Sequence, residues 1–222
     1  MALKELAKPG ERLKMTYEEF LAWADEDVHA EWVNGEVIIH MTAKDRHQDI
    51  VRFLIVLFDL FDQFFRVGKF RSAPFQMKLS PEGSGREPDI LFVAREHESR
   101  LTEEGVAGPA DLVVEIVSDD SVVRDRVEKF EEYEQHGVPE YWIIDPRPKR
   151  QRAEFYQLDE RGQYRPVPVE ADGRYHSRAL PGFWLQVDWL WADELPDSLF
   201  AFAEIANLPA DVVQALRSLQ RG

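Results

Sequence analysis

Two carboxylates inside apolar segments are the residues of this chain best suited to chemistry. Asp89 precedes the apolar run 90–93, and Glu115 interrupts the apolar run 112–117. Burying a carboxylate in such a strand is unfavourable unless a partner compensates its charge. A shared divalent cation is the simplest partner for two carboxylates, and hard oxygen ligands of this kind suit Mg²⁺ or Mn²⁺.

Lys129 is the cation that the spacing predicts beside this pair. In the helix predicted over 122–136, Asp125, Lys129 and Tyr133 follow one another at intervals of four residues and therefore share a face. If that face packs over the strand ends, Lys129 reaches toward Glu115, while Tyr133 fits a core residue with a hydrogen-bonded hydroxyl. A metal that activates water, with a cation that offsets developing negative charge, is what phosphodiester hydrolysis requires.

Each of these residues also has a plainer interpretation. Asp89 follows Pro88 and could cap a turn, whereas Glu115 could form a structural ion pair with Lys129 or with an arginine. Such pairs persist in proteins without catalysis. Lys129 taken alone would most often be a solvated helix lysine.

Two further residues are candidates for supporting roles. His47, near the start of a long predicted helix, could orient water or lie in the outer shell of the metal, and it could equally be an exposed first-turn histidine. Glu36 could approach the site from a predicted hairpin or remain on the surface. Glu31, in the same hairpin, is interpreted as structural.

Four basic residues surround a predicted turn, namely Arg147, Lys149, Arg150 and Arg152. They could contact phosphates. Charge runs in turns are usually only solvated, so the sequence favours the solvated interpretation.

The composition excludes several classes of protein. The 222 residues carry a formal net charge of -15, which disfavours binding to bare nucleic acid because phosphate contacts need Lys and Arg. The absence of cysteine excludes disulfides and thiolate metal sites. There is no run of about eighteen apolar residues, so no membrane span is expected. Residues 1–11 lack the apolar core of a signal peptide, and a cytoplasmic protein is expected.

The pattern of apolar residues predicts an α/β fold with a mixed sheet covered by at least two helices. Helices are predicted over 16–25, 43–65 and 122–136, with one or two short helices over 198–219. Strands are predicted over 31–39 (a hairpin with an Asn-Gly turn), 70–79, 90–94, 111–117, 140–145, 153–158, 164–169 and 174–183. The stretch 80–87 is predicted to be a turn.

These segments resemble the Uma2 family (DUF820) of restriction-endonuclease-like proteins in the PD-(D/E)xK superfamily. The resemblance is carried by Pro88-Asp89, the run 109–118, Lys129, Tyr133, Gly137-Val138, Glu140-Tyr141-Trp142 and Asp145-Pro146, with the hairpin 31–36, His47 and the run 180–183 in support. It covers roughly residues 16 to 192.

The resemblance implies a restriction-endonuclease-like core, a mixed β-sheet flanked by helices, with an N-terminal helix-hairpin and C-terminal helical additions. The chain would then comprise a lead-in (1–15), the nuclease-like domain (16–192) and a helical tail packed on the same domain (193–222).

For function, the resemblance implies a Mg²⁺-dependent endonuclease, with Mn²⁺ as an alternative ion, that acts on nucleic acid, DNA being favoured. Asp89 and Glu115 would be the metal ligands and Lys129 the catalytic cation. The chain departs from the superfamily pattern at Val117, where a lysine is usual, and the Uma2 pattern instead places the lysine at the position of Lys129. Related nuclease folds often pair to cut both strands, so a homodimer is expected.

A second interpretation belongs to a different class of function. The nuclease fold could be a catalytically inactive interaction or regulatory module whose acidic surface meets a basic protein partner. The net charge of -15 favours this interpretation, and the carboxylate pair with its lysine favours the enzyme.

Overall fold

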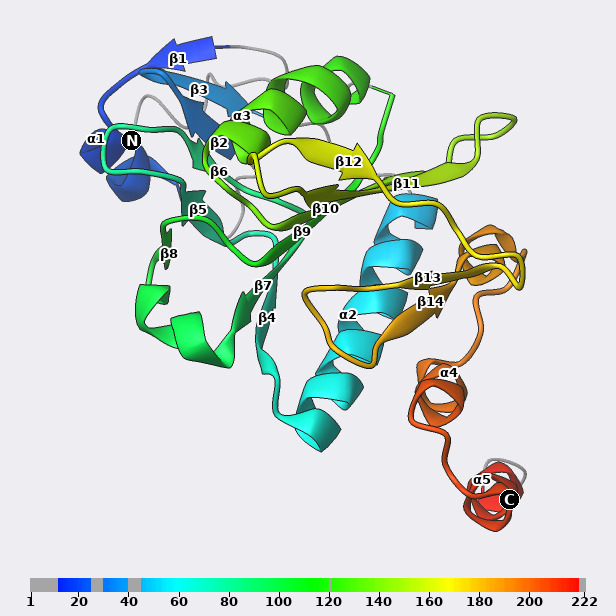
Figure 1. Ribbon diagram of the computed structural model, residues 1–222. Helices are drawn as coiled ribbons and strands as arrows, with labels where there is room; N and C mark the ends of the chain where they lie inside the picture. Colours follow the sequence, from blue (N-terminus) through cyan, green and yellow to red (C-terminus); the bar gives the residue numbers. More distant parts are fainter. Residues whose placement is uncertain (1–11, 25–29, 40–44, 120, 220–222) are drawn as a thin grey trace.

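Two mixed sheets of six strands each form the framework of the protein (Figure 1). The computed structural model describes residues 12–24, 30–39, 45–119 and 121–219. Helices flank both large sheets, as expected for the predicted α/β class, and a separate two-stranded hairpin lies beside one of the helices.

The central sheet contains the strands that carry the predicted site. In spatial order its strands are β12 (Tyr164–Pro166), β11 (Arg152–Leu158), β10 (Glu140–Asp145), β9 (Leu112–Ile116), β7 (Ile90–Ala94) and β4 (Gly68–Ser72). Only β9 and β10 run parallel, and the other neighbours are antiparallel. Both β9 and β10 are buried along their whole length, which explains their continuous apolar sequences.

Alternate residues of β9 belong to two different cores. Leu112, Val114 and Ile116 pack with α2 (Asp45–Phe65) on one face of the sheet. Val113 and Val117 pack on the opposite face with Tyr133, which belongs to α3 (Lys129–Gln135). Because successive side chains point to opposite faces, Glu115 shares the α3 face with Val113 and Val117.

The second sheet holds the N-terminal part of the chain. In spatial order its strands are β1 (Arg12–Lys14), β3 (Glu36–Ile39), β2 (Ala30–Val33), β6 (Gly85–Arg86), β5 (Gln76–Lys78) and β8 (Gly105–Ala107). Helix α1 (Tyr17–Trp23) begins with a capping box in which Thr16 and Glu19 each accept a hydrogen bond from the backbone N–H of the other. Asn34 and Gly35 both have positive φ, which confirms the tight turn predicted between β2 and β3.

Three predicted elements differ from the structure. The single strand predicted over 70–79 is two strands in different sheets, β4 and β5, because Pro74 lies between them and cannot donate a ladder hydrogen bond. The turn predicted over 80–87 contains β6. The strand predicted over 174–183 is β13 (Arg174–His176), followed by a turn and then β14 (Trp184–Gln186), with which it pairs.

The ends of the chain also add detail to the prediction. Arg12–Lys14 belongs to a sheet although the sequence places it in the lead-in, and the tail forms two helices, α4 (Ser198–Ile205) and α5 (Ala210–Leu219). The side chains of α4 enter the core around α2, whereas no residue of α5 is buried. The described residues also form two 3-10 helices, η1 (Arg95–Arg100) and η3 (Val187–Trp191). None of the helices in the described parts of the chain has the length and apolarity of a membrane span.

Candidate active site

The register of β7 and β9 brings Asp89 and Glu115 together. These antiparallel strands pair Ile90 with Val114, and Asp89 immediately precedes β7, so a continuation of the register places Asp89 beside Glu115. Side chains that lie directly opposite each other point to the same face of a sheet. The carboxylate of Asp89 is fixed there because its Oδ2 accepts the backbone N–H of Ile116 at 2.6 Å.

The helix over this face supplies the predicted lysine. The segment η2 (Arg124–Glu128) is a π-helical turn, in which the N–H of Lys129 donates to the carbonyl of Arg124, and it leads directly into α3. The Nζ of Lys129 lies 2.8 Å from Oε1 of Glu115, and the hydroxyl of Tyr133 donates to the same oxygen at 3.0 Å. Single π-helical turns inside helices occur frequently at functional sites.

Glu31, for which the sequence predicts only a structural role, is a member of this cluster. It is completely buried, and its Oε1 lies 2.7 Å from Nζ of Lys129. Arg86, which is not among the residues predicted for the site, pairs with Oε2 of Glu31 at 3.1 Å and with Glu132 at 2.6 Å. One signal is available in the sequence, an arginine and a carboxylate immediately before Pro88-Asp89, but the contact of Arg86 with Glu31 spans 55 residues.

Asp125 lies at the edge of the same cluster. It is buried, and its Oδ1 is 3.8 Å from Nζ of Lys129. Within the described chain this oxygen has no hydrogen-bond partner. Burial raises the pKa of Asp125 to about 6, although the charge of Lys129 opposes the shift.

Negative charge exceeds positive charge around Glu115. Burial raises the pKa of Glu115 to about 8; Lys129 opposes the shift, and the carboxylates of Asp125, Asp89 and Glu31 add to it. Burial lowers the pKa of Lys129, but the charges of Glu115, Glu31 and Asp125 outweigh it and raise the pKa, so the lysine stays charged. One ammonium thus serves several carboxylates, an arrangement that an added cation would stabilise.

His47 and Glu36, the two predicted supporting residues, lie in different surroundings. The Nε2 of His47 is 3.2 Å from Oδ1 of Asp89. Burial lowers the pKa of His47, but the hydrogen bond and charge of Asp89 outweigh burial, and the net shift is upward. Glu36 lies on β3, and none of the described contacts of Asp89, Glu115 or Lys129 is with Glu36.

The donor set fits a hard divalent cation that retains other ligands. Both side-chain partners of Glu115 within the described chain bind Oε1, which leaves Oε2 for a metal beside Asp89. Among the described residues no group of three or more His, Asp or Glu side chains forms a complete metal site. Mg²⁺ usually keeps several waters and is held by one or two carboxylates with substrate phosphates, so two carboxylates suffice.

Comparison with known proteins agrees with the fold and with the resemblance seen in the sequence. The chain is similar over 80% of its length, at 18% identity and a TM-score of 0.63, to a protein from Anabaena variabilis ATCC 29413 described as a "putative nuclease belonging to DUF820"; 97% of that chain is covered. No curated protein sequence matches the chain significantly. The model of the Uma2 family, described as "putative restriction endonuclease", matches residues 17–188. The chain therefore belongs to the Uma2 family.

Proposed function

We propose that this protein is a Mg²⁺-dependent endonuclease that hydrolyses phosphodiester bonds in nucleic acid, with DNA as the favoured substrate. The observation that carries the proposal is that Asp89 accepts the backbone N–H of Ile116, the residue after Glu115, while the buried ammonium of Lys129 lies 2.8 Å from Glu115. The description of the Uma2 family model, "putative restriction endonuclease", supports it.

Each residue of the cluster has a distinct role in this proposal. Asp89 and Glu115 would hold the cation, which when bound polarises the phosphoryl group and activates water. Lys129 fixes Oε1 of Glu115 and keeps a positive charge beside the carboxylates, where it offsets the negative charge that develops on the phosphoryl group. His47 donates from Nε2 to Asp89 and fixes the orientation of that carboxylate.

Titration calorimetry with Mg²⁺ and Mn²⁺ tests the metal site. We expect saturable binding to the wild type and its loss in Asp89→Asn/Glu115→Gln, because both substitutions keep the shape of the side chain and remove the charged ligand. The exposed pair Asp211→Asn/Glu160→Gln removes the same charge elsewhere and should bind like the wild type. Equal binding by all three proteins would refute the assignment of these ligands.

His47→Ala is expected to weaken metal binding and turnover by about 10- to 100-fold, the usual cost of losing a group that orients a ligand. Stability should change little, because the histidine contributes one hydrogen bond at the edge of the cluster. Metal affinity and cleavage rate are to be measured beside His176→Ala, which alters an exposed histidine. If His47→Ala cleaves at the wild-type rate, the histidine has no part in positioning Asp89.

A second candidate is a nuclease fold that binds partners without catalysis. It is favoured by the ion pairs that Lys129 already makes with Glu31 and Glu115, since a lysine held in this way can serve stability alone. A wild type that binds neither ion, with or without DNA, would put this candidate first. The homodimer and a basic protein partner stay predictions, and light scattering on the purified protein would test the first of them.

A further inference from the structure

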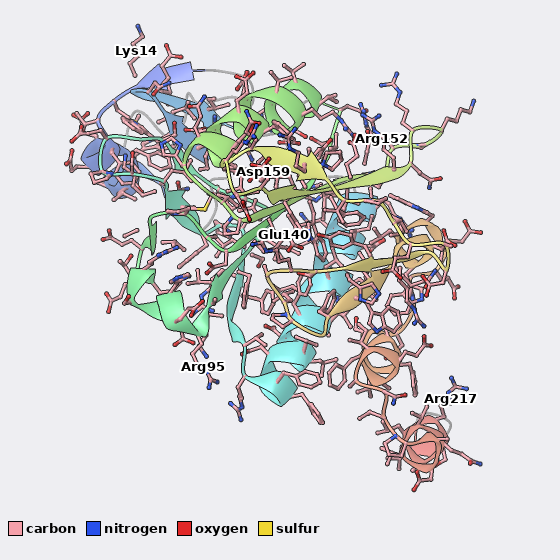
Figure 2. All side chains as sticks on the ribbon, in the orientation of Figure 1. Lys14, Arg95, Glu140, Arg152, Asp159 and Arg217 are labelled. Carbon is pink, nitrogen blue, oxygen red and sulfur yellow. The ribbon has the colours of Figure 1, made fainter. Side chains whose placement is uncertain are left out.

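The turn between β10 and β11 concentrates positive charge in an acidic protein. Arg147, Lys149, Arg150 and Arg152, here called the basic hairpin, lie within six residues, and no acidic residue falls between 146 and 153. Lys149, Arg150 and Arg152 are exposed. Figure 1 shows this turn extending beyond the edge of the central sheet, and Figure 2 labels Arg152 at its base.

The basic hairpin lies at the same end of the sheet as the candidate active site. Because β9 and β10 run parallel, their carboxyl ends share one edge, where the N–H of Val117 donates to the carbonyl of Ile144 at 2.8 Å. Just beyond that edge, Nη1 of Arg147 lies 3.8 Å from Asp119. Glu115 is two residues before Val117 in the same segment, so the hairpin borders the site.

Two of the four charges are uncompensated. Arg147 pairs with Asp145 at 2.9 Å, and Arg152 lies 3.4 Å from Glu154. Neither Lys149 nor Arg150 makes an ion pair with any part of the chain that the structure describes. Their charges are therefore available to an external anion.

The backbone at Lys149 adds a second observation. Its φ is +65°, a conformation that favours glycine or asparagine and is unfavourable for a lysine. Strained backbone conformations of this kind cluster at ligand-binding and active sites.

We propose that the basic hairpin binds the sugar-phosphate backbone of duplex DNA beside the bond to be cut. This inference rests on the proposed nuclease function. It also explains how a protein with a net charge of -15 could bind a polyanion, because the hairpin provides a local positive surface. Contacts of lysine and arginine with phosphates set the position of the protein on the duplex without reading its sequence.

Fluorescence anisotropy with a fluorescein-labelled duplex of mixed sequence tests the inference, with EDTA present so that no cleavage occurs. Lys149→Gly/Arg150→Gln should weaken binding roughly 10- to 100-fold at about 0.1 M salt. It should also reduce the slope of log K against log salt concentration by about 1.8, because each lost phosphate contact removes about 0.9. The glycine also relieves the positive φ, so the melting temperature should not fall.

Arg66→Gly/Arg95→Gln is the matched control. Arg66 has a φ of +58°, and both arginines are exposed without an ion pair to the described residues. Figure 2 shows Arg95 on the opposite side of the molecule from Arg152. The control makes the same change in charge and backbone, and we expect its binding to equal that of the wild type. Equal losses in the two pairs, or no loss in either, would overturn the inference.

Cleavage assays separate this inference from the proposed function. If the wild type cleaves DNA and the hairpin variant binds and cleaves like the wild type, the proposed function stands and the inference is wrong. If no protein cleaves but DNA binding falls only in the hairpin variant, the contact of the hairpin with DNA stands, while the proposed function and the placement beside a cut bond are refuted. A loss confined to single-stranded RNA, with duplex DNA binding unchanged, would also overturn the inference.

Discussion

Lys129→Met is expected to lower the free energy of unfolding by about 3–5 kcal/mol and to abolish hydrolysis. The substitution keeps the volume of the side chain but leaves Glu31, Glu115 and Asp125 buried without the ammonium that serves all three. Breaking a buried ion pair by removing one partner costs about this much, because the other charge remains buried and uncompensated. Urea denaturation followed by circular dichroism measures the loss of stability, and a plasmid cleavage assay measures activity.

A double variant separates the two effects of this substitution. Lys129→Met/Glu115→Gln removes a negative charge together with the positive one, so we expect it to recover part of the lost stability while remaining inactive. Arg86→Met is a useful comparison, because it removes a cation from Glu31, and Arg86 itself pairs with Glu31 and Glu132 and not with Glu115. If Lys129→Met is as stable as the wild type, the lysine is not the charge that holds the cluster together, and an active Lys129→Met would remove it from the mechanism.

Glu140→Leu is expected to destabilise the fold by about 4 kcal/mol or more without acting on the candidate active site. The buried carboxylate of Glu140 accepts four hydrogen bonds, two of them from the side chains of Trp142 and Tyr175 at 2.7 and 2.8 Å. The other two come from the backbone N–H groups of Arg178 and Ala179, both at 2.8 Å. Each buried donor left without an acceptor costs about 1–3 kcal/mol.

Glu140→Gln provides the graded control for this prediction. The amide of the glutamine keeps one acceptor oxygen, but its NH₂ group replaces the other oxygen and faces donors that it cannot accept from. We therefore expect a free energy of unfolding between those of the wild type and Glu140→Leu. Urea denaturation orders the three proteins, and calorimetry checks that the remaining folded protein binds Mg²⁺ as the wild type does. A Glu140→Leu variant within 1 kcal/mol of the wild type would show that the donors find other acceptors.

The comparison of Glu115 with Glu140 shows how far the sequence could identify the site. Both are glutamates in apolar strands, and both are buried. Glu140 is satisfied by neutral donors, whereas Glu115 faces a lysine and three further carboxylates. Burial alone therefore indicates only that other groups compensate the charge of a carboxylate. Whether the carboxylate can hold a metal depends on which groups these are.

The sequence by itself determined the elements whose causes are local. The helices that become α2 and α3, the Asn-Gly turn and the buried strands β7, β9 and β10 follow from apolar spacing, capping and turn residues within a few positions of one another. The placement of Lys129 beside Glu115 was also predictable, because a strand, a short connection and a helix leave few ways to pack.

Only the tertiary structure decided the contacts between distant segments. The inclusion of Glu31 and Arg86 in the cluster depends on the pairing of β2 with β6 and on how α3 packs over both. The division of 70–79 between two sheets likewise depends on which strands are available as partners. Strand pairing is set by long-range packing rather than by local preference. A short window of sequence therefore predicts neither the cluster around Glu31 and Arg86 nor the division of 70–79 between two sheets.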